Sequence, residues 1–233
     1  KISADILREK DDQSENDLID MIRDAAGNKG TGRWTSIEAL KQEYNASLLT
    51  AAYQARVMSN QTELRRKFHG VLPACTEEGG LDAETIRRAY SLAKVIAYAQ
   101  GFGLYHDASE RNGWHLDLKA IASIFRAGCI IQARLLQDIM NAYEAEPELV
   151  NLLEAKQFST LLQENIGDLK KTVLWALAHN VPLPLFTNAL IYVSQLSADS
   201  LGANMIQAQR DYFGAHTFER IDGEGHVHHE WGK

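Results

Sequence analysis

A glycine-rich segment near the start of the sequence combines the residue types that bind anions. Residues 27–34 read GNKGTGRW and carry a hydroxyl at Thr31 between two cations, Lys29 and Arg33. Glycines expose backbone N–H groups and permit positive φ, and a helix beginning near Thr35 would direct its positive dipole end to the same place. The segment therefore predicts an anion-binding bend. The alternative is a flexible connection between helices whose charges are solvated.

Two familiar phosphate-binding motifs come close to this segment but do not fit it. A Walker A loop needs Lys and then Ser or Thr after its last glycine, whereas Arg33 and Trp34 follow Gly32. The dinucleotide fingerprint needs a further glycine where Thr35 stands, and a strand before the loop, where none is predicted. Neither a P-loop nor a dinucleotide site is expected.

Further cations lie on a helix and near the C-terminus. Arg56 has apolar neighbours at helical spacing, so it either extends outward to solvent or points into a polar cleft. Residues 210–216 read RDYFGAH and place Arg210 and His216 around two aromatics, which is typical of an interface anchor. The alternative is an ordinary helix end capped by Gly214, with His216 beside the dipole.

No pattern in the sequence predicts a catalytic group or a metal site. His226, His228 and His229 could ligate a metal, but such a terminal run is more often solvated. Cys75 and Cys129 lack the spacing of a metal or redox motif. No Ser/His/Asp or Cys/His arrangement can be assembled, so we assign neither catalytic residues nor metal ligands.

Charge and composition limit the partners. The 233 residues include 24 Lys and Arg against 31 Asp and Glu, a formal net charge of −7. This is the opposite of a nucleic-acid footprint, so a local cluster of cations has to hold any anionic ligand. No apolar run approaches the roughly 18 residues of a membrane span. We therefore predict a cytoplasmic protein with no nucleic-acid or membrane partner.

Helices are the elements that must position these residues. Apolar residues recur at helical spacing almost everywhere, and strict alternation is nearly absent, which predicts an all-α fold. Asp82 and Asp117 are expected N-caps, and Thr35 with Glu38 makes a capping-box pattern. Small residues such as Gly103 predict that the longest helix is buried and closely approached. The predicted helices cover residues 35–43, 46–59, 82–111, 118–125, 130–144, 156–179, 184–196 and 203–213.

Six strings, found in order along the chain, carry a resemblance to a known family. They are IRDAAGNKGTGRWTSIEAL (Ile22–Leu40), AYAQGF (Ala97–Phe102), FRAGCIIQARLL (Phe125–Leu136), EPELVNLL (Glu146–Leu153), VPLPLFTNAL (Val181–Leu190) and IQAQRDYFGAHTFERID (Ile206–Asp222). Over essentially its whole length the chain resembles 6-phosphogluconate dehydrogenase, the decarboxylating enzyme family of the pentose phosphate pathway.

The resemblance implies an architecture. It implies an all-α helical domain over residues 1–203, for substrate binding and dimerisation, and a C-terminal helix and tail over 204–233. Members form homodimers in which each tail packs on the partner subunit, and a Rossmann domain that binds NADP precedes the helical domain. Lys1–Leu7 already reads as helix interior, so we expect that the natural start is missing. The resemblance covers only most of the helical domain and the tail, which implies that the Rossmann domain is absent here. The helix with the family's catalytic Lys and Glu is expected to be absent too, which would leave this chain alone inactive.

The resemblance also implies a substrate site. By position in the motifs, the residues that would contact 6-phosphogluconate are Lys29, Thr31, Arg56, Arg210 and His216, the last two reaching the neighbouring subunit. A sugar acid phosphate carries a carboxylate and a phosphate of about −1.5 to −2, which three cations and a titratable His complement. In the intact enzyme, C3 of the substrate is oxidised by NADP and CO₂ is lost, giving ribulose 5-phosphate.

The chain departs from the family pattern at some positions, and two alternatives stay open. Arg33 replaces the usual Lys, Gln42–Ser47 lacks the usual Gly-x-Pro turn, and His229 stands where the tail has Thr. One alternative is a non-catalytic helical dimerisation module that has lost its ligand site. The other is a related β-hydroxyacid dehydrogenase, whose unphosphorylated substrate would leave Arg56 and Arg210 idle.

Overall fold

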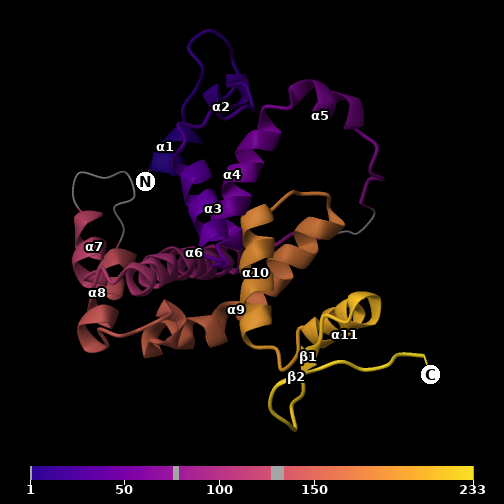
Figure 1. Cartoon of the computed structure of the whole chain (residues 1–233). Coiled ribbons are helices and arrows are strands. Elements are labelled where there is room, and N and C mark those ends of the chain that lie inside the picture. The colour runs from indigo at the N-terminus through magenta and orange to yellow at the C-terminus, as the bar shows by residue number, and fades with distance from the viewer. Residues whose placement is uncertain (1, 76–78, 127–133, 233) are drawn as a thin grey trace. The chain divides into compact units, whose positions relative to one another are not determined.

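Helices are the dominant secondary structure of the described chain (Figure 1). A computed structural model describes residues 2–75, 79–126 and 134–232. The predicted all-α class is confirmed, and among these residues the regular strands are one pair of two residues each. The chain divides into two compact units, Lys1–Leu190 and Ile191–Lys233. The boundary predicted between residues 203 and 204 falls inside the second unit.

The first unit is built from helices α1 to α9 and the beginning of α10. Their bounds are α1 Ile2–Ile6, α2 Leu18–Met21, α3 Thr31–Lys41, α4 Ser47–Ser59, α5 Thr62–Phe68, α6 Ala83–Asn112, α7 Leu118–Ile124, α8 Leu135–Ala145, the 3₁₀ turn η1 Leu152–Glu154, α9 Lys156–Ala178 and α10 Pro184–Leu196. The second unit contains the end of α10, then α11 Ala203–Gly214 and the strands β1 Phe218–Glu219 and β2 His226–Val227.

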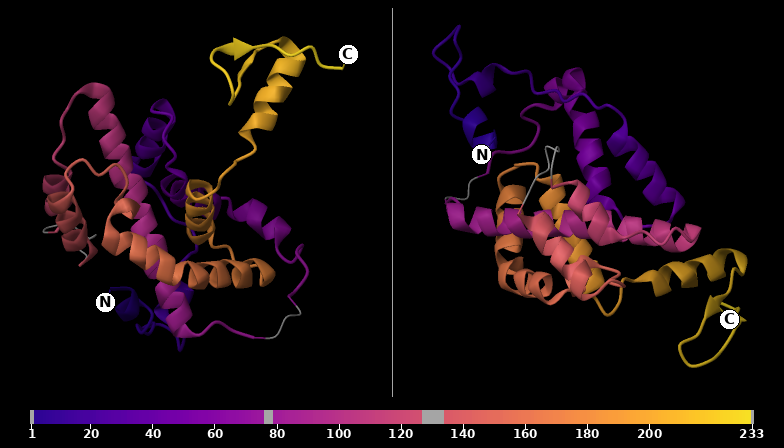
Figure 2. Two further views of the ribbon diagram at one scale, coloured as in Figure 1. Left: turned by 90° about the horizontal axis from the view of Figure 1, so that it is seen from below. Right: turned by 90° about the vertical axis from the view of Figure 1, so that its left-hand side faces the viewer.

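The longest helix, α6, is the axis of the first unit. The Asp82 carboxylate accepts a hydrogen bond from Thr85 N at 2.8 Å, and Gly113 ends the helix in the left-handed region at φ 62°. Leu92 and Ile96 are completely buried. Helix α9 packs against α6, and α4 also packs against α6 (Figure 2). The predicted cap and the predicted burial of α6 are both confirmed.

A close contact at Gly103 brings Tyr44, in the connection between α3 and α4, against α6. A Cβ added at Gly103 would lie 2.9 Å from Tyr44 Cζ and would overlap the Tyr44 hydroxyl. Ala39, Ala46 and Leu104 are buried beside this tyrosine. A residue without a side chain is therefore required here, as the run of small residues on this helix predicts.

The start of α3 differs from the predicted start. The helix begins at Thr31 because Gly30, at φ 109°, serves as its N-cap and its carbonyl accepts a hydrogen bond from Trp34 N at 2.9 Å. Thr35 instead donates its hydroxyl to Thr31 O at 2.9 Å, inside the helix. The capping box predicted at Thr35 and Glu38 is therefore wrong: a glycine in the left-handed region begins the helix one turn earlier.

Other predicted helices agree closely with the structure. Asp117 caps α7 by accepting from Ala120 N at 2.9 Å, as predicted. Helix α8 begins at Leu135, and the earlier part of the helix predicted over 130–144, like Cys129, lies outside the described residues. The short helices α2 and α5 were not among the predicted elements, whereas α1 lies where the start of the sequence already reads as helix. No helix in the described ranges has both the length and the apolar character required to cross a bilayer.

Candidate functional site

Three of the predicted site residues line one cavity in the first unit. This α3–α4 cavity, of about 700 Å³, lies where the glycine-rich segment meets α4. It is lined by Gly27, Asn28, Lys29, Thr31, Gly32, Thr35, Leu49, Ala52, Tyr53 and Arg56. Two of these side chains are cations and none is a carboxylate, although the whole chain carries a formal charge of −7. The structure thus brings Lys29, Thr31 and Arg56 together on a locally positive surface.

The first turn of α3 adds backbone donors to this cavity. Asn28 Oδ1 accepts from Gly30 N at 2.9 Å, which closes the bend before the helix. No side chain caps the N-terminus of α3. The backbone N–H groups at the start of the helix, from Thr31 on, are therefore available as donors to another acceptor. A Cβ added at Gly32 would lie 3.6 Å from Tyr53 Cβ, so this turn packs directly against α4. A helix N-terminus and cations on one cavity form an anion-binding arrangement.

A buried amide fixes α4, which carries Arg56. The Gln100 side chain on α6 is fully buried; its Oε1 accepts from Leu48 N at 2.9 Å and its Nε2 donates to Ser47 Oγ at 3.0 Å. These bonds tie the N-terminus of α4 to α6, since a buried amide is stable only when its polar atoms are paired. Arg56 lies in the last turn of the same helix, exposed at the cavity.

Contacts from the C-terminal end of α4 and from α5 hold the residues that precede Lys29. Ser59 Oγ accepts from Ala26 N at 2.9 Å, and Asn60 Nδ2 donates to Ala26 O at 2.7 Å. Arg65 Nη1 donates to Asp24 O at 3.0 Å, and its Nη2 lies 2.5 Å from Asp24 Oδ2. These contacts join residues more than thirty positions apart, so no local pattern in the sequence predicts them. The only local sign of these contacts is the polar pair Ser59 and Asn60 at the end of α4.

The other cation of the glycine-rich segment does not reach the cavity. Arg33 is exposed on α3, and it is not among the residues that line the α3–α4 cavity. Arg33 thus belongs to the same glycine-rich segment as Lys29, but its charge lies outside the wall of the α3–α4 cavity. Arg33 is therefore a natural reference for the two cations that do line the cavity.

Arg210 and His216 belong to the second unit. Both are exposed, and Arg210 Nη1 donates to Gln207 Oε1 at 2.8 Å along α11. The His216 ring lies over Gly214, where an added Cβ would come within 3.0 Å of His216 Nε2. Gly214 is the last residue of α11, and the left-handed C-cap is Ala215 at φ 51°. The alternative of a helix end capped by Gly214 therefore differs from the structure, in which Gly214 is still helical and its lack of a side chain leaves room for the His216 ring.

One carboxylate organises the second unit. The Asp211 side chain is completely buried; its Oδ1 accepts from Thr217 N at 2.9 Å and lies 2.9 Å from His228 Nδ1. Its Oδ2 accepts from His229 N at 3.0 Å and from Trp231 Nε1 at 2.8 Å. We call these five residues the Asp211 cluster. The position of His228 in the sequence predicts a solvated histidine of a tail. In the structure its ring instead contacts the buried Asp211 carboxylate.

The cluster holds Asp211 in its ionised form. Burial alone raises the pKa of this carboxyl, but hydrogen bonds from the His229 amide, the His228 ring, the Trp231 indole and the Thr217 amide lower it further than burial raises it. The net result is a pKa well below the ordinary range of an aspartate. Asp211 is therefore a fixed negative charge whose lone pairs are used inside the unit.

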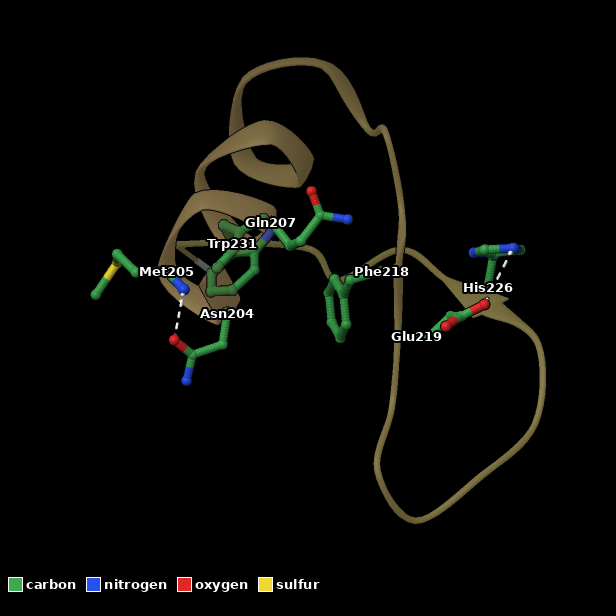
Figure 3. Close-up of a pocket in the computed structure, with 8 residues that line it drawn as sticks. Asn204, Met205, Gln207, Phe218, Glu219, His226 and Trp231 are labelled. Atoms are coloured by element: carbon green, nitrogen blue, oxygen red, sulfur yellow. Dashed lines mark hydrogen bonds and ion pairs between the residues drawn. The ribbon is translucent and has the colours of Figure 1, made fainter. Parts of the chain in front are cut away.

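The second unit also has a cavity of its own, of about 680 Å³ (Figure 3). It is lined by Asn204, Met205, Gln207, Ala208, Phe218, Glu219, His226 and Trp231. At one side Glu219 Oε1 lies 3.6 Å from His226 Nε2, and neither Arg210 nor His216 is part of the wall. Within the described ranges, no group of His, Cys, Asp and Glu side chains could hold a metal ion.

Comparison with known proteins matches the sequence to one family model. The model is that of the 6-phosphogluconate dehydrogenase C-terminal domain, and it matches residues 1–231. The chain belongs to the 6-phosphogluconate dehydrogenase family. The resemblance carried by the six strings is thereby confirmed.

Individual relatives agree with this assignment. The NADP(+)-dependent, decarboxylating 6-phosphogluconate dehydrogenase of Bacillus subtilis is 44% identical over 238 residues, covering 100% of this chain and 51% of the relative. The decarboxylating enzyme of Escherichia coli is 43% identical over 234 residues, covering 99% and 50%. The structure of 6-phosphogluconate dehydrogenase from Plasmodium falciparum matches with a TM-score of 0.94 and 38% identity, covering 99% and 50%. The chain spans about half the length of these relatives.

Proposed function

We propose that this chain is the substrate-anchoring and dimer-forming part of a cytoplasmic, NADP-dependent, decarboxylating 6-phosphogluconate dehydrogenase. One observation carries the proposal: Lys29, Thr31 and Arg56 line a single cavity whose wall contains no carboxylate. The Plasmodium falciparum relative has been solved with its substrate 6-phosphogluconate and with NADP+. The activity assigned to the relatives is the oxidative decarboxylation of that sugar acid.

The α3–α4 cavity suits the phosphate end of the substrate. Arg56 offers a planar guanidinium that can hold phosphate oxygens in bidentate geometry, and Lys29 adds a compact charge. The Thr31 hydroxyl and the uncapped first turn of α3 donate further hydrogen bonds. Fixing the phosphate fixes the rest of a flexible six-carbon chain, and orientation of this kind is a large part of catalysis.

The described residues offer no dinucleotide site of the usual kind. Such a site needs a parallel sheet with a glycine-rich turn between a strand and a helix. Among the described residues the regular strands are the antiparallel pair β1 and β2, each of two residues. The relatives also include an NAD(+)-dependent enzyme of Bacillus subtilis at 42% identity, nearly as similar as the NADP(+)-dependent one at 44%. We therefore assign to this chain the substrate side of the reaction.

A second copy of the chain is the proposed partner. We propose a homodimer in which Arg210 and His216 of one tail complete the α3–α4 cavity of the other copy. The tail supports this role because Tyr212 and Phe213, between the two site residues, are 61% and 84% exposed. Large exposed aromatics beside an arginine are characteristic of interface anchors.

Calorimetric titration with 6-phosphogluconate tests the proposal. The wild-type chain should bind it, and Arg56→Ala should raise Kd by about tenfold to a hundredfold, the usual effect of removing a charged hydrogen bond. Arg33→Ala removes the same charge from the same segment, outside the cavity wall, and should bind almost like the wild type.

The same titration distinguishes the two alternatives. Inorganic phosphate should compete with 6-phosphogluconate, and gluconate should bind much more weakly. Equal affinity for gluconate and 6-phosphogluconate would instead indicate the enzyme for an unphosphorylated acid. A wild-type chain that binds neither ligand would leave a dimerisation module as the better description.

A further inference from the structure

Asp211 is an acidic residue next to a cation that is assigned to an anionic substrate. A neighbouring carboxylate would ordinarily compete with the ligand for Arg210. Here the competition is avoided, because both Asp211 oxygens accept hydrogen bonds from the other members of the Asp211 cluster. Arg210 itself donates to Gln207. The negative charge of Asp211 is thus directed toward the interior of the second unit, away from the exposed Arg210 side chain.

The same residue holds both sides of His216. Asp211 O accepts from Ala215 N at 2.9 Å, and Asp211 Oδ1 accepts from Thr217 N at 2.9 Å. Ala215 and Thr217 have φ of 51° and 63°, a region that residues with a side chain seldom adopt and that surrounding contacts must impose. His216 is therefore the centre of a strained turn whose two flanks are bonded to Asp211.

This turn places the imidazole on the face of α11 that carries Arg210. The His216 ring lies over Gly214, and Gly214 follows Arg210 by four positions in α11. Residues four apart lie on the same face of a helix, one turn from each other. The ring thus covers the end of the helix face that carries Arg210.

We propose that Asp211 is a positioning residue of the substrate site, which holds the His216 imidazole on the Arg210 face of α11 so that both meet one anion. The inference rests on the proposed function, because it concerns the same 6-phosphogluconate. It adds a residue that touches no ligand and acts through the backbone on either side of His216. It also gives the C-terminal residues a role, since His228, His229 and Trp231 supply three of the four donors to the side chain.

Asp211→Asn in the full chain tests the inference. The amide keeps the size of the side chain but replaces one acceptor oxygen by a donor facing the other donors. We expect the signals of the Thr217 amide and the Trp231 indole to move in ¹H–¹⁵N spectra, and Kd for 6-phosphogluconate to rise about fivefold to tenfold. Asp222→Asn is the matched control: this exposed carboxylate pairs with Arg220 at 2.6 Å in the same unit and should leave Kd unchanged.

A double-mutant cycle separates positioning from general support of the fold. If Asp211 acts through His216, Asp211→Asn should have little further effect on Kd in a His216→Ala background. Gly214→Ala should also weaken binding, by displacing the ring, while the Trp231 indole signal stays in place. This variant keeps the inference testable should Asp211→Asn unfold the second unit.

The outcomes are distinct. Wild-type affinity in Asp211→Asn, fully additive effects in the cycle, or wild-type affinity in Gly214→Ala would each overturn the positioning role while leaving the proposed function intact. Failure of the wild-type chain itself to bind 6-phosphogluconate would overturn the proposed function, and the positioning role with it.

Discussion

The surroundings of the α3–α4 cavity and the Asp211 cluster both hold exposed residues of the proposed site in place, but by different means. Around the cavity, Ser59, Asn60 and Arg65 hold the segment before Lys29 through several exposed hydrogen bonds from the end of α4 and from α5. In the second unit, one buried carboxylate gathers four donors and fixes the turn around His216. The first support is distributed over many weak contacts, and the second is concentrated in one residue.

The difference has consequences for how each region responds to change. Exposed hydrogen bonds exchange readily with water, so each contributes little to stability. A buried charge that loses its partners is far more costly. Substitutions near the cavity should therefore separate ligand affinity from folding, whereas substitutions in the Asp211 cluster should change affinity and local structure together.

The largest expected effect comes from removing both cavity cations. Lys29→Ala combined with Arg56→Ala should raise Kd for 6-phosphogluconate by about a hundredfold or more, because two charged hydrogen bonds are lost. Both side chains are exposed, so the free energy of unfolding should change by less than about 1 kcal/mol. Calorimetry and thermal unfolding measure the two quantities.

The control for that double variant removes the same charge elsewhere in the unit. Arg33→Ala with Arg66→Ala takes away two exposed cations, neither of which lines the cavity. Should this control weaken binding as much as the cavity variant does, the general charge of the first unit would explain the affinity and the cavity would not.

The next effect depends on the two regions meeting across a dimer. Arg56→Ala chains and Arg210→Ala chains should each bind poorly alone, while an equimolar mixture that has exchanged subunits should recover about a quarter of the wild-type sites. Recovery follows because one site of each mixed dimer combines an intact cavity with an intact tail. No recovery in exchanged dimers would mean that each chain uses its own tail.

A smaller effect is expected where the support is distributed. Asn60→Ala removes the bond to Ala26 O and should raise Kd only about threefold, because Ser59 and Arg65 still hold the segment. Gln54→Ala, an exposed amide of α4 outside the cavity wall, is the control. A tenfold loss in Asn60→Ala would show that the support is concentrated here too.

The smallest expected change concerns pH. Because the folded-state pKa of Asp211 is lowered, its contribution to stability is present above the unfolded value of about 3.9 and is lost only as pH falls through the folded value. The Trp231 indole signal should therefore persist from pH 7 to about pH 4.5. The Trp175 indole, which donates to Gly79 O at 3.1 Å, is the reference. Loss of the Trp231 signal alone between about pH 6 and pH 5 would contradict a lowered pKa.

Helical periodicity and capping residues predicted most of the fold. Asp82 and Asp117 cap the helices as predicted, because an N-cap depends on contacts within one turn. The start of α3 was mispredicted, because a left-handed glycine at Gly30 competes with the pattern at Thr35 and the choice depends on how the bend packs. The strands β1 and β2 were missed, being only two residues each.

The residues of the candidate site that are charged, or lie beside charged residues in a motif, could be predicted from the sequence. Lys29, Thr31 and Arg56 were singled out by residue type and motif, and they share a cavity. Gln100 and Asp211 were passed over, because their roles consist of bonds to residues distant in sequence. A buried polar residue carries no local pattern that distinguishes it from an exposed one, so only the folded structure identifies it.

A crystal structure of the chain with 6-phosphogluconate would test the central claim most directly. The account predicts the phosphate in the α3–α4 cavity, within hydrogen-bond distance of the Arg56 guanidinium and the Lys29 ammonium. A phosphate bound elsewhere, such as in the cavity lined by Phe218 and Trp231, with the α3–α4 cavity empty, would contradict it.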